Sequence, residues 1–161
     1  MQDRSLLQGR QDGGRYPMPP SGEKRGVNLM VAIPEPVARM IKHPDTHKVL
    51  TTVSPDSKPH AIVCASLALS GDDTILVAEV FMHRTCEYLK TNPNVEVLVW
   101  QGKNGYSLKA VTTGRLVEGP EFDKMSAAMD RYNLATVAVW EFKVLEIWDE
   151  SASKKAGEKV A

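Results

Sequence analysis

The sequence predicts a mainly β protein with a few helices, built as a small six-stranded antiparallel barrel. Three observations support this fold class. About six short runs rich in β-branched residues are separated by clusters of turn residues. The first two runs are spaced as a hairpin, and helical patterns occur at only a few points. The chain lacks the GxGxxG and GxxxxGK[ST] motifs of the common nucleotide-binding α/β folds.

The first half of the chain contains a short helix followed by three strands. Val37, Met40 and Ile41 share one helical face, and Pro44 ends that helix. Residues 48–53 and 61–69 are rich in apolar and β-branched residues and flank a Pro/Asp/Ser turn cluster, which predicts a hairpin. A turn at 70–73 leads to a third strand, 74–81.

The second half continues with strands and two more helices. A short helix after the third strand ends at Asn92-Pro93, and the next strand is expected at 95–100. A Gly-rich loop (101–106) leads to a long strand (107–118), in which Gly114 predicts a bulge or bend. Gly119-Pro120 begins a helix that runs to about residue 131. The last strand is expected at about 136–149.

Composition limits the class of protein and its partners. The chain has 161 residues, a formal net charge of +0 and a pI of about 6.9, so nucleic acid and membranes are not expected partners. We expect a flexible N-terminal extension (1–28), one domain (29–150) and a charged C-terminal tail (151–161). The two cysteines, Cys64 and Cys86, form no CxxC pair, and no secretory segment is apparent. These features favour a cytoplasmic protein.

No metal site is expected. His43 and His47 are four residues apart, a spacing that would place both on one helical face. Pro44 lies between them and interrupts the helix, and no carboxylate or cysteine completes a ligand set. Both are interpreted as surface histidines.

The stretch from Val80 to Trp100 organises the predicted site. A strand ends, polar and basic residues follow, and a short helix begins within the segment His83-Arg84-Thr85. The first turn of a helix carries unpaired N–H groups and the positive end of the dipole. A cation at this end is electrostatically unfavourable unless an anion lies nearby. The stretch therefore predicts an anion pocket.

The order of elements resembles the FMN-binding split-barrel proteins, the superfamily of pyridoxamine 5′-phosphate oxidase. The resemblance rests on an opening hairpin (50–60) and on Met82-His83-Arg84-Thr85 followed by Leu89 and Asn92-Pro93. The Gly-rich loop and the Val-Thr-Thr-Gly strand continue it. It covers roughly residues 49–148. Ile62 and Leu67 are apolar where the oxidase has Arg and Lys, which argues against oxidation of pyridoxamine 5′-phosphate. Thr85 stands where the oxidase has Lys, and in this the chain resembles the small flavin-binding branch more closely.

The resemblance implies a six-stranded split β-barrel and a homodimer with FMN at the subunit interface. It also implies phosphate contacts from Arg84 and Thr85, with His83 nearby. Lys109 stands where the family often has a polar side chain near the flavin, and two interpretations stay open: a bond to the pyrimidine edge of the ring, or an outward, solvated lysine. The complete implied cofactor-binding set is Val63, Cys64, Ala65, Ser66, Ala78, Glu79, Val80, Met82, His83, Arg84, Thr85 and Lys109.

The resemblance favours an FMN flavoprotein that acts as a flavin reductase-like oxidoreductase or as an electron carrier. The sequence identifies no catalytic residue and no redox partner; His60 and His83 are candidates by residue type alone. Two alternatives stay open at this point. The same fold could bind F420 or haem, with Lys103, Lys109 and Arg115 meeting the acidic tail of F420. The barrel could also be a non-catalytic binding or regulatory module.

Overall fold

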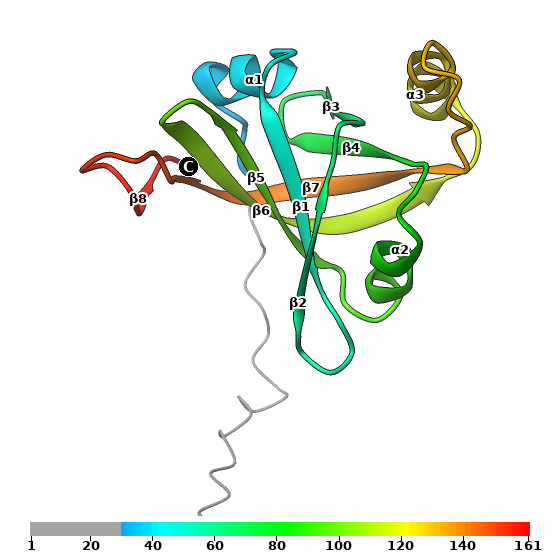
Figure 1. Cartoon of the computed structure of the whole chain (residues 1–161), viewed down its shortest axis with the longest axis horizontal. Helices are drawn as coiled ribbons and strands as arrows, with labels where there is room; N and C mark the ends of the chain where they lie inside the picture. The colour runs from blue at the N-terminus through cyan, green and yellow to red at the C-terminus, as the bar shows by residue number, and fades with distance from the viewer. Residues whose placement is uncertain (1–29) are drawn as a thin grey trace, which may run out of the picture.

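A computed structural model describes residues 30–161, so the expected N-terminal extension lies outside the described residues. Its strands form one antiparallel sheet that curls around a core (Figure 1). The order across the sheet is β2-β1-β5-β6-β7-β4-β3, and β8 pairs with β7. Within the described part, the elements are α1 (Glu35–Lys42), β1 (His47–Val53), β2 (Pro59–Val63), β3 (Leu67–Ser70), β4 (Thr74–Glu79), α2 (His83–Leu89), β5 (Asn94–Gln101), β6 (Asn104–Leu116), α3 (Pro120–Asp130), β7 (Ala138–Asp149) and β8 (Glu158–Lys159).

The mainly β, antiparallel fold class is confirmed, but the sheet has eight strands in the described residues where six were expected. The expected strand 61–69 is two strands. β2 pairs with β1 and β3 pairs with β4, at opposite edges of the sheet, so one straight strand could not serve both. The chain therefore turns at Cys64–Ser66. The other addition is β8, which lies in the charged tail.

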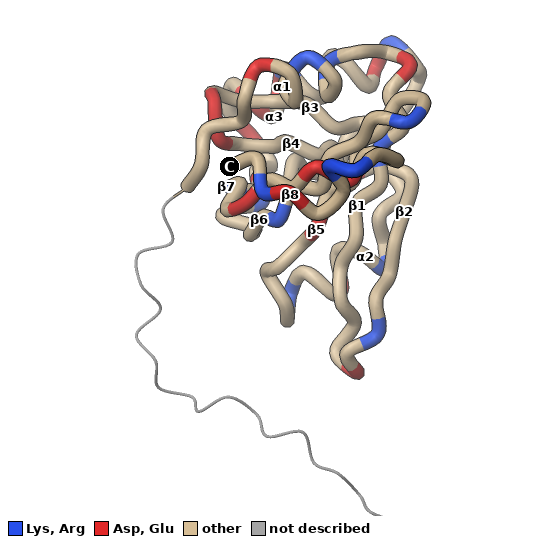
Figure 2. The backbone as a smooth tube through the Cα atoms, turned by 90° about the vertical axis from the view of Figure 1, so that its left-hand side faces the viewer, with Lys and Arg blue, Asp and Glu red and all other residues tan. Residues whose placement is uncertain are grey.

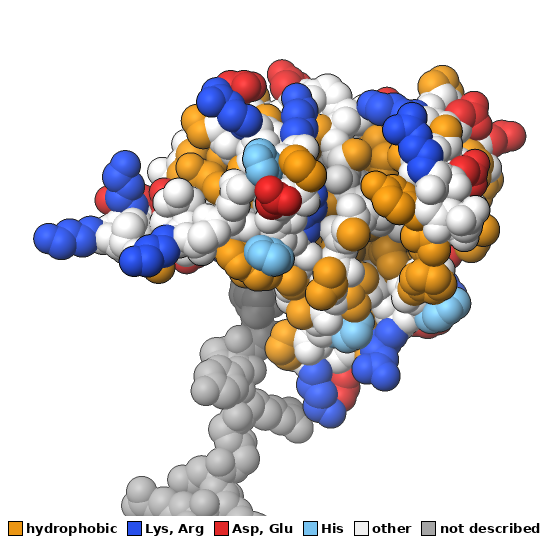
Figure 3. Space-filling view, turned by 45° about the horizontal axis from the view of Figure 1, so that its top comes forward, with side chains coloured by type: hydrophobic (Ala, Val, Ile, Leu, Met, Phe, Trp, Pro, Cys, Tyr) orange, Lys and Arg blue, Asp and Glu red, His pale blue; other side chains and the backbone are white. Residues whose placement is uncertain are grey.

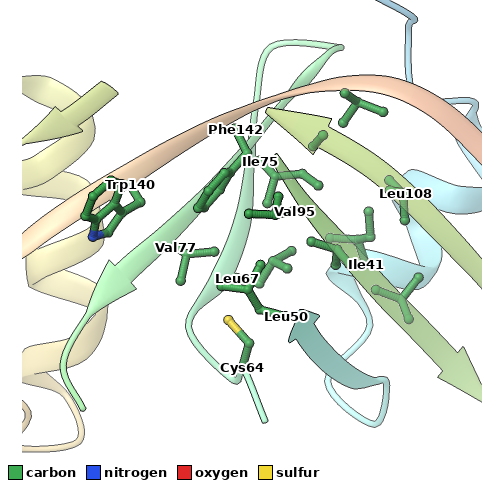
Figure 4. Packing of buried hydrophobic residues seen from close by; sticks show 14 of the residues in the cluster. Ile41, Leu50, Cys64, Leu67, Ile75, Val77, Val95, Leu108, Trp140 and Phe142 are labelled. Atoms are coloured by element: carbon green, nitrogen blue, oxygen red, sulfur yellow. The ribbon is translucent and has the colours of Figure 1, made fainter. Parts of the chain in front are cut away.

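The inner face of the curled sheet holds the main core. On β5, Val95, Val97 and Val99 are buried and alternate with more exposed residues, as expected for a strand with one face inward. Phe142 and Leu50 are also fully buried, and Figure 4 shows them pointing into the same cluster. Helix α1 packs against β3 and β5.

Strand β4 is buried along nearly its whole length because it is covered on both faces. Ile75 and Val77 point into the main core, whereas Leu76 and Ala78 belong to a second, smaller cluster. Met125 from α3 packs in that second cluster. Helix α3 thus covers the outer face of β4 at one end of the sheet.

The bulge expected near Gly114 is confirmed. The pairing of β6 with β7 shifts register between Thr112 and Gly114. A Cβ at Gly114 would lie 2.9 Å from a carboxylate oxygen of Glu141, so a glycine gives the partner side chain its space. The bulge bends β6 just before Arg115, which belongs to the site described below.

Acidic and basic residues are interspersed along the described backbone (Figure 2). This agrees with the balanced charge of the sequence. None of the helices in residues 30–161 has the length and apolar character needed to cross a membrane.

Burial predicts that the same Val→Ala substitution has very different effects on stability at two positions. Val144 is fully buried, whereas Val117 is 58% exposed. We expect Val144→Ala to lower the free energy of unfolding by about 2 kcal/mol, since it removes buried methyl groups and leaves a cavity. Val117→Ala should change it by less than about 0.5 kcal/mol. Urea unfolding of the two variants measures both values, and equal losses would contradict the assigned burial.

Candidate functional site

An apolar groove of about 590 Å³ lies at the end of the sheet where β2, β4 and α3 come together. We call it the ring groove. Val63, Cys64, Ala65 and Ser66 form one side, and the end of β4 forms another. On the face shown in Figure 3, hydrophobic side chains gather across the right-hand half. The complete lining is Pro44, Lys48, Ile62, Val63, Cys64, Ala65, Ser66, Ala78, Val80, Phe81, Met82, Met129, Tyr132 and Leu134.

The segment after β2 is tied to β4 by two hydrogen bonds. The Ser66 hydroxyl donates to the carbonyl oxygen of Ala78 at 3.0 Å. The Ala78 N–H donates to the carbonyl oxygen of Ser66 at 3.4 Å. These bonds use the Ser66 hydroxyl hydrogen and fix the distance between the two sides of the groove. Ser66 can still accept a hydrogen bond from a ligand.

A second hollow, of about 570 Å³, lies beside α2 and is polar. We call it the basic hollow; it is lined by Glu79, His83, Arg84, Cys86, Glu87, Lys90, Arg115 and Trp140. Arg84 and His83 are exposed, and neither forms an ion pair with any residue between 30 and 161. Lys90 pairs with Glu87 at 2.7 Å.

Glu79 is the most constrained residue of the basic hollow. Its carboxylate accepts hydrogen bonds from Arg115 Nε at 2.8 Å and Nη2 at 3.0 Å. Trp140 Nε1 also donates to it, at 2.8 Å. The hydrogen bonds from Arg115 lower the pKa of Glu79, and burial raises it. The effect of Arg115 is the larger, so the pKa of Glu79 lies below its ordinary value of 4.5. Glu79 is therefore ionised at neutral pH, and most of its hydrogen-bonding capacity is already used.

Both cysteines lie at these two sites, and both are unreactive. Cys64 lines the ring groove and Cys86 lines the basic hollow. Burial is the main cause that raises the pKa of each thiol to about 11. In Cys86, the neighbouring Glu79 carboxylate raises it further. Thiolate is the reactive form, so neither residue is a nucleophile near neutral pH.

Thr85 is buried below the first turn of α2. Its hydroxyl has no hydrogen-bond partner among the described residues. The same holds for Thr52 Oγ1 and His60 Nε2, which belong to paired residues of β1 and β2. The His60 ring packs edge-on against Tyr88 of α2, with 5.3 Å between ring centroids. A phosphate bond to Thr85 would require the first turn of α2 to move, because the chain itself encloses the hydroxyl.

The expected cofactor-binding residues thus fall into four groups. Lys109 lies in a third hollow, of about 400 Å³, where its Nζ is 3.7 Å from Glu146. Thr85 is enclosed, as described. The remaining residues divide between the two main sites: Glu79, His83 and Arg84 line the basic hollow, and Val63, Cys64, Ala65, Ser66, Ala78, Val80 and Met82 line the ring groove.

Sequence reasoning missed one whole wall of the ring groove. Met129, Tyr132 and Leu134 come from the end of α3 and the loop after it, more than 40 residues beyond the strands they face. No local pattern connects them with 63–66. Lys48 was also missed, because its strand was interpreted only as part of the barrel wall. Arg115 meets an acidic ligand tail only in the F420 alternative, and in the structure it pairs with Glu79.

The hydrogen bonds that Arg115 and Trp140 donate to Glu79 predict a pH-dependent contribution to stability. A carboxyl group whose pKa is lowered by folding stabilises the fold above its unfolded pKa, and this contribution is lost as the pH falls through the folded pKa. We expect Glu79→Gln to cost about 1 kcal/mol at pH 7. The difference from wild type should shrink below about pH 4.5. Urea unfolding at pH 7 and 3.5 measures it, with Glu87→Gln as the exposed-pair control. A constant difference across this range would contradict the assignment.

Solved structures share this fold. An FMN-binding protein from Syntrophomonas wolfei subsp. wolfei is 23% identical, with 73% of this chain and 86% of that chain covered and a TM-score of 0.65. A protein described as an F420 reductase is 16% identical, with coverage of 71% and 98% and a TM-score of 0.58. HutZ, a haem storage protein from Vibrio cholerae, is 12% identical, with coverage of 75% and 97% and a TM-score of 0.53. At these identities the likeness shows the fold alone.

At the level of sequence, no curated protein matches the chain, but one family does. The family described as Pyridoxamine 5′-phosphate oxidase matches residues 35–151, which include nearly the whole sheet and both sites. The chain belongs to the pyridoxamine 5′-phosphate oxidase family.

Proposed function

We propose that the protein is an FMN-binding flavoprotein, with the flavin ring in the ring groove and the phosphate at the basic hollow. One observation supports this most strongly. The apolar groove lies close in sequence to Arg84, which is exposed and has no ion-pair partner among residues 30–161; only Met82 and His83 come between Arg84 and the groove residue Phe81. A planar apolar body with a phosphate on a flexible chain matches this combination. The groove volume also lies within the usual range for small-molecule sites.

Each part of FMN has suitable groups in the chain. Val63, Ala65 and Val80 offer apolar contact to a ring. Arg84 offers a guanidinium fork, the preferred partner of a phosphate, and His83 lies beside it. In this proposal Thr85 contacts the phosphate only after the first turn of α2 shifts, and Glu79 acts by holding Arg115.

The reaction class follows from the cofactor. FMN supplies hydride or single-electron transfer, and the protein supplies binding, orientation and control of water access. Among the described residues that line the groove there is no carboxylate and no histidine, and Cys64 keeps its proton. The chain therefore offers few groups for acid–base chemistry, which favours a flavin reductase-like oxidoreductase or an electron carrier. We place it in the cytoplasm, since both cysteines are free.

The first test separates phosphate recognition from ring binding. We expect the purified protein to bind FMN, seen as quenching of flavin fluorescence and as a shifted absorbance spectrum. Arg84→Ala should lower the affinity for FMN by about tenfold or more, since hydrogen bonds to charged groups contribute about 1.5–3 kcal/mol. The same variant should bind riboflavin, which lacks the phosphate, as well as the wild type does.

Arg39→Ala is the matched control, because Arg39 lies on α1 outside both sites. It should leave both affinities unchanged. Equal loss of FMN and riboflavin in Arg84→Ala would mean that Arg84 does not meet the phosphate. Parallel titrations with F420 and haem compare the cofactors of the structural relatives. Tighter binding of either one than of FMN would overturn the choice of cofactor.

We also propose that the protein is a homodimer whose interface includes the rim of the ring groove. Val63, Phe81 and Tyr132 line the groove and are 84%, 78% and 72% exposed. Large apolar side chains exposed together are typical of interaction surfaces. A symmetric partner would cover them and close the groove to water.

Sedimentation equilibrium tests the dimer. Phe81→Asp should shift the protein toward monomer, because a carboxylate in an apolar interface is costly. Val117→Asp introduces the same charge at a site that is also exposed but does not line the groove. It should leave the association state unchanged. A monomeric wild type would exclude this interface.

A further inference from the structure

Lys48 is the one charged side chain that lines the ring groove within residues 30–161. It belongs to β1 and is half-buried. Its backbone carbonyl accepts a hydrogen bond from the N–H of Cys64 at 2.9 Å, so the turn 64–66 fixes its strand beside the groove. The other lining residues are apolar or uncharged, and the enclosed thiol of Cys64 keeps its proton because burial raises its pKa to about 11.

Lys48 differs from every other cation on the described strands. Lys109 and Lys159 each lie within 4 Å of Glu146, Arg115 pairs with Glu79 and Lys143 pairs with Asp73. Lys48 has no carboxylate within that distance among the described residues. A cation in an apolar groove is costly unless an opposite charge meets it. Its partner is therefore expected to come from the ligand.

The phosphate is not the best partner for Lys48. The basic hollow already offers Arg84 and His83, and neither of these residues lines the ring groove. The anion at Lys48 should therefore belong to the part of the ligand that lies in the groove. A flavin ring that takes up two electrons and one proton, the proton at N5, gains one negative charge on its pyrimidine edge.

We propose that Lys48 meets this negative charge and thereby stabilises the reduced form of the bound ring over the oxidised form. The inference rests on the proposed FMN function and assigns Lys48 as a positioning and tuning residue. It also gives Lys48 the role at the pyrimidine edge that the resemblance suggested for Lys109. Lys109 instead faces Glu146, with its Nζ 5.4 Å from the centroid of the Trp148 ring.

The test compares affinities for the two redox states. Lys48→Met keeps an unbranched side chain one atom shorter and removes the charge, and Lys48→Gln is a second neutral variant should the first fold poorly. Oxidised FMN is titrated by fluorescence, and the two-electron midpoint potential is measured by dithionite reduction against a reference dye. We expect the neutral variants to bind oxidised FMN with an affinity within about threefold of the wild type. Their affinity for reduced FMN should fall by about tenfold more than that for oxidised FMN. A tenfold selective loss lowers the potential by about 30 mV.

Lys48→Arg should keep the midpoint potential of the wild type, since arginine carries the same charge. Lys159→Met, on β8 outside the groove, should have no effect. Three results would overturn the proposal. They are an unchanged potential in both neutral Lys48 variants, an equal loss of affinity for both redox forms, and a fall in potential in Lys109→Met alone. These failures differ from failure of the proposed function, in which the wild type binds no FMN and both proposals fall together.

Discussion

The position at which β4 ends determines the geometry of both sites. Ala78 and Glu79 are the last two residues of β4, and successive residues of a strand point to opposite faces. Ala78 therefore lines the ring groove, whereas Glu79 lines the basic hollow. The three residues after the strand, Val80, Phe81 and Met82, all line the ring groove. Pairing with β7 on one side and β3 on the other fixes the strand, and the bonds of Glu79 to Arg115 and Trp140 hold its last residue.

This arrangement places two chemical environments within a few residues of each other. One is apolar and contains a single cation, Lys48, which has no ion-pair partner among residues 30–161; the other is polar with several cations. The ligand class that satisfies both has an apolar planar body and an anionic extension. The fold itself does not choose among such ligands, since relatives described as FMN-binding, F420-reducing and haem-storing proteins share it. In the proposed function, side chains such as Arg84 and Lys48 make that choice.

Local patterns predicted the elements well and their assembly less well. The β1–β2 hairpin, the helix start near His83 and the bulge at Gly114 follow from residues close together in the chain, and the structure contains all three. The break at 64–66 carries no turn signal, because the run around it is apolar, and it depends on pairing at opposite sheet edges. Met129 and Tyr132 meet the groove through tertiary packing alone. For a strand lysine, alternation gives the face but not which face lines a groove, so the sequence does not show that Lys48 lines the ring groove.

The buried thiols have a consequence for the lifetime of the protein. Reduced flavins pass electrons to dioxygen and release hydrogen peroxide, which oxidises thiolates far faster than thiols. Cys64 lines the groove in which such a ring would lie, yet it is buried and its pKa is about 11. Susceptibility to oxidation follows thiolate character and exposure. In the proposed function, the Cys64 sulfur is therefore expected to resist oxidation although it lines the groove proposed for the ring.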